Sequence, residues 1–111
     1  GVGRRPELLV SLIRATDPRW VGACYDFGHG APERLYDAAR ILAPYAFHAH
    51  AKSRAFDPRG EETSIEYGRV LSILRFASYV GALSIEYLGE DDPIEGIRKT
   101  RDLIRRHWRA Y

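Results

Sequence analysis

Asp26, His50 and Glu86 have side chains that bind metal ions or move protons, and each lies in or at the end of a short, largely apolar segment. The spacing is 24 residues from Asp26 to His50 and 36 residues from His50 to Glu86, which is typical of consecutive strand–helix units. His29 follows Asp26 by three positions. Two carboxylates and an imidazole that converge would form a mixed oxygen and nitrogen site suited to Mn²⁺, Mg²⁺, Co²⁺ or Zn²⁺.

Taken alone, most of these residues also allow a purely structural role. Asp26 can accept hydrogen bonds from the amides of the Gly-rich loop after it, and His29 can be a loop residue without a role. His48 and His50 can be two strand histidines hydrogen-bonded inside the protein. Their convergence with the carboxylates is what favours a metal site.

Glu86 is harder to explain by structure alone, because it lies between Ile85 and Tyr87 in an apolar segment. Burying a carboxylate is costly unless it is paired or binds a metal. Lys52 has three open interpretations: a counter-ion for Glu86, a donor to a substrate oxygen, or a lysine at a strand end that reaches solvent.

Hydrophobic periodicity and turn residues predict the elements that must position these side chains. The pattern predicts a helix followed by three strand–helix units, with a long polar loop over residues 53–64. In the third helix, Phe76 is expected to supply apolar contacts together with Val70, Leu71 and Leu74. The predicted helices are 6–15, 32–44, 65–77 and one that starts at Pro93, and the predicted strands are 21–26, 46–52 and 82–87.

Single helices between strands require crossover connections, so the strands should be parallel and the fold class α/β. One face of each strand is small or polar and includes Asp26, His50 and Glu86, while the other, which includes Tyr25 and Phe47, should pack on helices. Outer helices around a tight polar interior are typical of a (β/α) barrel, whose chemistry lies at the carboxyl ends of the strands. A full barrel takes roughly 250 residues. We therefore expect one partial barrel domain over residues 1–111, as an excised piece of something longer.

Composition excludes several other classes of protein. Hydrophobic residues make up 45% and charged residues 29%, with a formal net charge of +2, which is typical of a globular protein and gives no basic footprint for nucleic acid. The single cysteine, Cys24, rules out an internal disulfide framework and a thiolate zinc site, and it favours a cytoplasmic location. No apolar run is long enough to span a membrane.

Three segments of the chain resemble the sugar phosphate isomerase/epimerase family of xylose isomerase-like barrels. Residues 21–29, VGACYDFGH, look like the family's sixth strand, residues 48–53, HAHAKS, like its seventh, and residues 84–89, SIEYLG, like its eighth. The resemblance implies a C-terminal portion of a (β/α)8 TIM barrel, with three parallel strands and about four helices. It runs through nearly the whole chain.

The resemblance also implies roles for individual residues. Asp26, His50 and Glu86 would be the metal ligands, and Glu86 would also act in acid/base catalysis. His29 would contact a small carbohydrate substrate, and His48 and Lys52 are further expected substrate-binding residues. The implied reaction is isomerisation or epimerisation, in which a proton moves next to a carbonyl and the metal stabilises an enediolate.

The family's fourth ligand, a glutamate of the fifth strand, would lie upstream of Gly1, so we expect the 111 residues alone to be inactive. Two alternatives remain open. The chain could be an inactive half-barrel that associates with another copy or with the missing barrel half, or belong to another metal-dependent lyase or dehydratase of the same superfamily. Three carboxylates in a row at residues 90–92 would repel a phosphate, which favours an unphosphorylated ketose or polyol.

Overall fold

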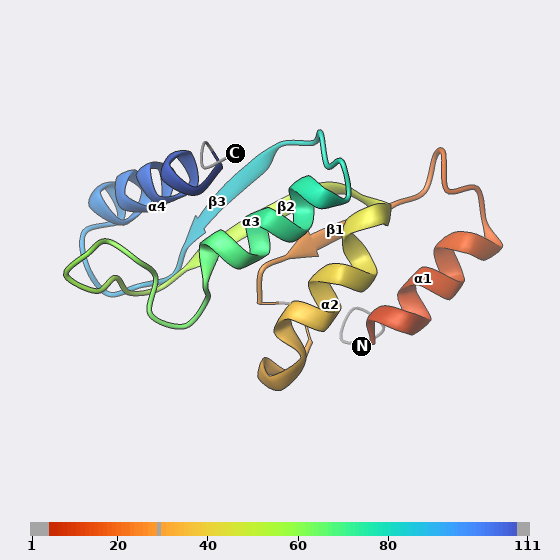
Figure 1. Cartoon of the computed structure of the whole chain (residues 1–111), viewed down its shortest axis with the longest axis horizontal. Helices are drawn as coiled ribbons and strands as arrows, with labels where there is room; N and C mark the ends of the chain where they lie inside the picture. Colours follow the sequence, from red (N-terminus) through yellow and green to blue (C-terminus); the bar gives the residue numbers. More distant parts are fainter. Residues whose placement is uncertain (1–4, 29, 109–111) are drawn as a thin grey trace.

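The computed structural model describes residues 5–28 and 30–108. One helix precedes three strand–helix units, which is the predicted order (Figure 1). β1 begins two residues later than predicted, and β3 begins one residue later. Two short 3-10 turns, η2 (Pro32–Arg34) and η3 (Ala43–Tyr45), flank the second helix. The α-helices and strands are α1 (Pro6–Ala15), β1 (Ala23–Asp26), α2 (Leu35–Leu42), β2 (Ala46–Ser53), α3 (Tyr67–Phe76), β3 (Leu83–Tyr87) and α4 (Pro93–Trp108).

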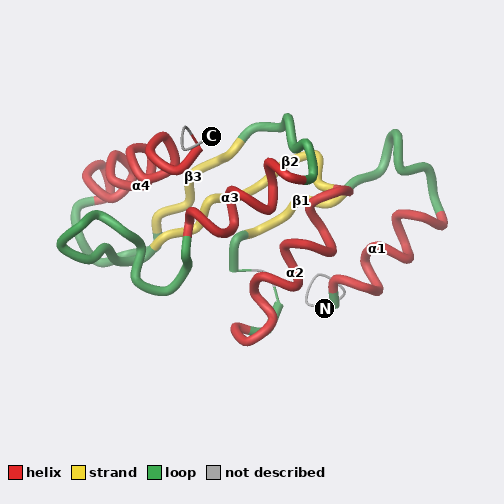
Figure 2. Tube along the Cα trace, viewed as in Figure 1, coloured by secondary structure: helices red, strands yellow, loops and turns green. Residues whose placement is uncertain are grey.

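The three strands form one parallel sheet in the order β1-β2-β3, which confirms the α/β fold class. Asp26 pairs with His50 across β1 and β2, and Lys52 pairs with Glu86 across β2 and β3. Since all strands run the same way, their carboxyl ends meet at one edge of the sheet. The loops that follow β2 and β3 lie side by side at this edge in the trace of Figure 2, joined by a hydrogen bond from the N–H of Leu88 to the carbonyl of Ser53.

One face of the sheet is covered by helices, and that is where the core lies. Ala49 and Ala51 of β2 are fully buried in a cluster with Tyr67, Leu71 and Leu74 of α3. The small alanines let the larger side chains of α3 lie close to the strand. On the opposite face of β2, His48, His50 and Lys52 are only partly buried. The predicted alternation of the two faces is therefore confirmed along this strand.

Two aromatic residues predicted to pack in the core do not do so. Phe76 is 95% exposed, because the buried residues of α3 form a stripe over Tyr67, Val70, Leu71 and Leu74, and Phe76 lies about 200° around the helix from Leu74. Phe47 is 51% exposed at the start of β2, where its ring lies beside Gly22, a neighbour with no side chain to cover it.

The long loop between β2 and α3 is ordered by one buried carboxylate. Glu62 is only 7% exposed and accepts hydrogen bonds from the backbone N–H groups of Arg54, Ala55, Ser64 and Ile65. Glu61 fixes the same loop to the end of α4 through Arg106 and His107. The polar loop predicted from the sequence is thus a fixed structure at the carboxyl edge of the sheet.

Within the described part of the chain, no helix has both the length and the apolar character needed to cross a bilayer.

Candidate metal centre

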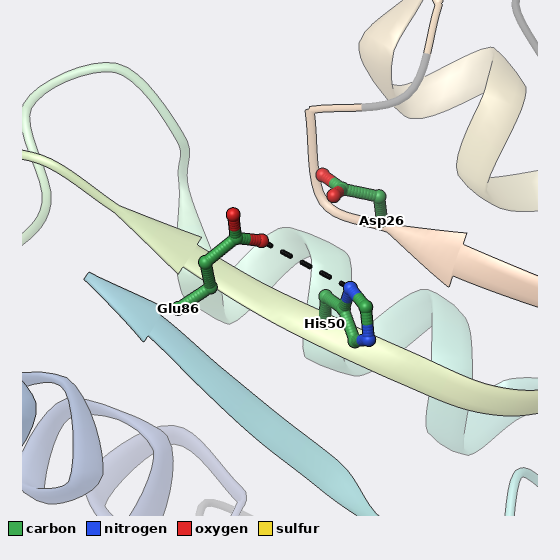
Figure 3. A group of neighbouring side chains, drawn as sticks. All are labelled: Asp26, His50 and Glu86. Carbon is green, nitrogen blue, oxygen red and sulfur yellow. Dashed lines mark ion pairs between the residues drawn. The ribbon is translucent and has the colours of Figure 1, made fainter. Parts of the chain in front are cut away.

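Asp26, His50 and Glu86 come from three adjacent strands and meet on the exposed face of the sheet (Figure 3). Asp26 is the last residue of β1, His50 lies in β2, and Glu86 is the penultimate residue of β3. One potential ligand atom of each residue lies within 4.8 Å of those of the other two. The convergence predicted from spacing is therefore present in the structure.

The imidazole of His50 turns its Nδ1 atom toward Glu86, at 3.9 Å from Oε2. The two side chains are 39% and 42% exposed, and that of Asp26 is 24% exposed. These donors are close enough to share one ion, and they remain accessible from solvent.

The donor set fits a divalent cation. Two carboxylates supply hard oxygen ligands and one imidazole supplies a nitrogen ligand, a combination that suits Mn²⁺, Mg²⁺, Co²⁺ or Zn²⁺. Asp26, His50 and Glu86 could each supply one ligand, which leaves coordination positions for other groups.

Asp26 is held in place on both of its oxygen atoms. Oδ1 accepts a hydrogen bond of 2.8 Å from the backbone N–H of Gly28, and Oδ2 lies 3.2 Å from the ammonium of Lys52. The loop-amide role considered for Asp26 and its place in the triad are thus both observed. Among the described residues Lys52 is the ion-pair partner of Asp26 and not of Glu86.

Cys24 is a residue that the sequence analysis did not include in the site. Its Sγ atom lies 3.7 Å from Nε2 of His50, on the side of the ring opposite Glu86. A histidine that binds a metal through one nitrogen commonly forms a hydrogen bond through the other. The strand alternation places Cys24 on the same face as Asp26, and this pattern could have predicted that Cys24 lies in the site.

The other predicted substrate-contacting residues lie beside the triad or outside the described residues. Nε2 of His48 lies 2.8 Å from the hydroxyl of Ser84, and its ring meets that of His50 edge to face at 5.3 Å. His48 therefore lies next to the triad without joining it. His29 falls outside the described residues.

Tyr67 fixes the end of β2 from the buried side. Its hydroxyl donates a hydrogen bond of 2.6 Å to the carbonyl of Lys52. Burial raises the pKa of this hydroxyl, so it stays protonated and remains a donor at neutral pH. The backbone that presents Lys52 and His50 is held by the core behind it.

Two curated proteins are similar to the chain over most of its length. It is 38% identical over 85 residues to a 3'-dehydrocarminate deglycosidase alpha subunit from a Microbacterium species, which covers 72% of this chain and 23% of that protein. It is 35% identical over 82 residues to a C-glycoside deglycosidase alpha subunit from Arthrobacter globiformis, which covers 68% of this chain and 22% of that protein. The matches thus span less than a quarter of each relative.

The sequence of residues 1–107 also matches a protein family described as the xylose isomerase-like TIM barrel. The parallel sheet, its covering helices and the position of the triad at the carboxyl edge agree with this match. Both of these relatives are named as deglycosidase subunits, and the chain belongs to the xylose isomerase-like TIM-barrel family.

Proposed function

We propose that the protein carrying this chain removes a proton from the carbon next to the carbonyl of a sugar substrate at a divalent metal site, as an isomerase or epimerase does. The observation that supports this most strongly is the meeting of Asp26, His50 and Glu86 within 4.8 Å at the carboxyl edge of a parallel sheet. In barrels this edge carries the catalytic residues.

Asp26, His50 and Glu86 would hold the ion. A divalent cation bound there supplies a Lewis acid that polarises the substrate carbonyl and stabilises negative charge on its oxygen. Glu86 is the proposed acid/base residue, because its side chain is the more exposed of the two carboxylates and is available to a substrate carbon. Lys52 and His48 lie beside the triad, where an ammonium and an imidazole can bind substrate oxygens.

A second candidate function is deglycosylation, which the two curated relatives favour. In a sugar oxidised to a ketone, the same deprotonation leaves an electron pair beside the carbonyl. That pair can form a carbon–carbon double bond while the bond to a substituent on the next carbon breaks, and the substituent leaves with the bonding electrons and takes up a proton. Isomerisation and elimination therefore share their first step and differ in the fate of the electron pair.

We further propose that the active protein is cytoplasmic and that this chain works in association with other protein segments. Both relatives are named as alpha subunits. The fourth carboxylate ligand that the family resemblance implies would come from the rest of the barrel. A chain without such a partner is the inactive assembly module considered above.

The proposal is tested by hydrogen exchange in D₂O. The protein that carries this chain is incubated with Mn²⁺ and, in separate reactions, with D-fructose, D-tagatose and a 3-keto-glycoside, and NMR follows deuterium uptake at the carbon next to the carbonyl. We expect uptake with at least one substrate, and we expect Glu86→Gln to abolish it. The product then separates the two candidates, since an epimer or aldose indicates isomerisation and a released aglycone indicates elimination.

The matched control is Glu90→Gln, which removes an exposed carboxylate from the loop just after β3. Exchange that survives Glu86→Gln, or that is lost equally in Glu90→Gln, would contradict the proposed role of Glu86.

A further inference from the structure

Lys52 places a positive charge directly beside the triad. Its ammonium lies 3.2 Å from Oδ2 of Asp26, and the side chains of both residues are 24% exposed. The other oxygen atom of Asp26, Oδ1, accepts a hydrogen bond from the backbone N–H of Gly28. A cation that binds Asp26 therefore shares this carboxylate with a cation that belongs to the protein itself.

The position of this lysine is fixed along its length. Its carbonyl accepts a hydrogen bond from the hydroxyl of Tyr67, and its backbone pairs with that of Glu86 across β2 and β3. Farther along the side chain, Cδ and Nζ lie 3.5 Å and 3.8 Å from the point where a Cβ atom would stand at Gly28. The lysine stem therefore runs alongside the turn after β1, and the ammonium is held at Asp26.

The net charge of this cluster changes sign when a divalent cation is added. Asp26 and Glu86 contribute two negative charges and Lys52 contributes one positive charge, while a histidine that binds a metal is neutral. The cluster therefore carries one net negative charge by itself and one net positive charge with the ion. With a neutral residue in place of Lys52, the loaded cluster would carry no net charge.

This charge gives Lys52 two opposite effects. Its ammonium repels a cation at the triad, and it attracts an anion that is bound to that cation. The ammonium can also donate a charge-assisted hydrogen bond to an oxygen atom of the anion, and such bonds are stronger than those between neutral groups. Because Lys52 is only partly exposed, solvent and salt screen its charge less than they screen a fully exposed one.

Further charged residues lie around Lys52. Arg54 and Glu62 line the same cavity as Lys52, and the carboxylate of Glu62 accepts four hydrogen bonds from backbone N–H groups. Arg54 also lines a neighbouring cavity together with Glu90 and Asp91. Replacing Lys52 leaves all of these charges in place, so the resulting change in affinity reports on the ammonium alone.

We infer that Lys52 sets the charge preference of the metal centre: it weakens the binding of the divalent cation and strengthens the binding of a small oxyanion, a carboxylate or an enediolate, to the loaded centre. The inference rests on the metal site of the proposed function. It gives Lys52 a role beyond contact with a neutral substrate oxygen. A lysine that only supports the fold would not have two effects of opposite sign.

The first test measures Mn²⁺ affinity by isothermal titration of the protein that carries this chain. Lys52→Met removes the charge and keeps an unbranched side chain, and it should bind Mn²⁺ about tenfold more tightly. Lys52→Arg keeps the charge and should stay within about threefold of the wild-type affinity. The matched control is Lys99→Met, which removes the chain's other lysine, an exposed residue of α4, and should leave the affinity unchanged.

The second test titrates two small probes into the same proteins loaded with Mn²⁺. Glycolate carries a carboxylate next to a hydroxyl, and glycolamide has nearly the same shape without the charge. Lys52→Met should bind glycolate about tenfold more weakly than the wild type does, because the ammonium no longer attracts the anion. Its affinity for glycolamide should stay within about twofold, and Lys99→Met should behave as the wild type with both probes.

Loss of structure cannot imitate the expected result, since it would weaken the binding of Mn²⁺ and of glycolate together. If Lys52→Met does not fold, as judged by circular dichroism, Lys52→Gln takes its place. A neutral variant that binds Mn²⁺ no more tightly than the wild type, or glycolate no more weakly, would overturn the inference. Equal changes in Lys99→Met would overturn it as well.

The same titrations separate this inference from the proposed function. Mn²⁺ binding that Glu86→Gln weakens and that Lys52→Met leaves unchanged overturns the role of Lys52 alone. Both effects of Lys52 in a protein without deuterium uptake overturn the proposed proton transfer and leave the role of Lys52 intact. Absence of Mn²⁺ binding at the triad overturns both.

Discussion

Alternate residues of β2 face two different environments. Ala49, Ala51 and Ser53 are fully buried against the helices, whereas His48, His50 and Lys52 alternate with them on a face that solvent reaches. The buried side consists of small residues because α3 lies against it, and the open side carries the groups that could do chemistry. Stability and function are therefore divided between two faces of the same strand, and substitutions on each face should have separable effects.

The largest effect is expected on the open face, from Glu86→Gln. Replacing a ligand carboxylate by a neutral amide should weaken Mn²⁺ binding by about a thousandfold, more than the roughly 10–100-fold typical of residues that only support a ligand. The free energy of unfolding should change by less than about 0.5 kcal/mol, because the side chain is 42% exposed. Isothermal titration and chemical denaturation of the same sample check both values. A large loss of stability would contradict the division between the two faces.

The buried face should respond in the opposite way, as Leu74→Ala tests. Leu74 is fully buried in α3, so its truncation should lower the free energy of unfolding by about 3 kcal/mol. The Mn²⁺ affinity of the folded protein should stay within about twofold of the wild-type value, since the space left by the missing side chain lies in the core, away from the triad. The matched control is Phe76→Ala in the same helix, which should cost less than about 0.5 kcal/mol because Phe76 is 95% exposed. Equal losses of unfolding free energy in the two variants would contradict the burial of Leu74 and the exposure of Phe76.

Cys24 offers a third test of the division between the two faces, because it lies on the open face without being one of the three ligands. Its Sγ atom lies 3.7 Å from Nε2 of His50 and helps to keep Nδ1 turned toward Glu86. Cys24→Ala should weaken Mn²⁺ binding by about tenfold, and Cys24→Ser, which keeps a hydrogen-bonding group, should recover most of that loss. Isothermal titration measures both. Identical affinities in the wild type and in both variants would remove Cys24 from the site.

The smallest expected effect comes from Tyr67, which supports the open face from the buried side. Tyr67→Phe should cost about 1 kcal/mol at pH 7, through loss of the hydrogen bond to the Lys52 carbonyl. Burial raises the pKa of Tyr67 in the folded state, so its stabilisation is complete below the unfolded pKa of about 10 and is lost as the pH rises above that value. The difference between wild type and Tyr67→Phe should therefore shrink by about 0.8 kcal/mol by pH 10.5. Denaturation at the two pH values tests this, and a gap that stays constant or widens contradicts it.

The sequence predicts the architecture and the triad well, because both follow from simple periodicities. Strands of a parallel sheet end at one edge, so the order of the elements and the alternation within each strand are enough to bring Asp26, His50 and Glu86 together. The helix 6–15 is predicted with its observed bounds, because Pro6 begins it and apolar residues recur at helical spacing.

The remaining details depend on side-chain directions and on contacts distant in sequence. Phe76 is apolar but two residues out of phase with the buried stripe of α3, so composition alone places it wrongly. Lys52 forms its ion pair with Asp26 and not with Glu86 because of the direction in which its long, flexible side chain extends. Glu62 joins the two ends of the loop between β2 and α3 through hydrogen bonds to Arg54 and Ile65, and no local sequence pattern predicts these contacts.

The metal site is tested by anomalous diffraction from crystals of the protein that carries this chain, soaked in Mn²⁺. We expect one strong manganese peak within coordination distance of the carboxylates of Asp26 and Glu86 and of Nδ1 of His50. A manganese peak located elsewhere, or no peak between these three side chains at saturating Mn²⁺, would rule out a metal site formed by Asp26, His50 and Glu86.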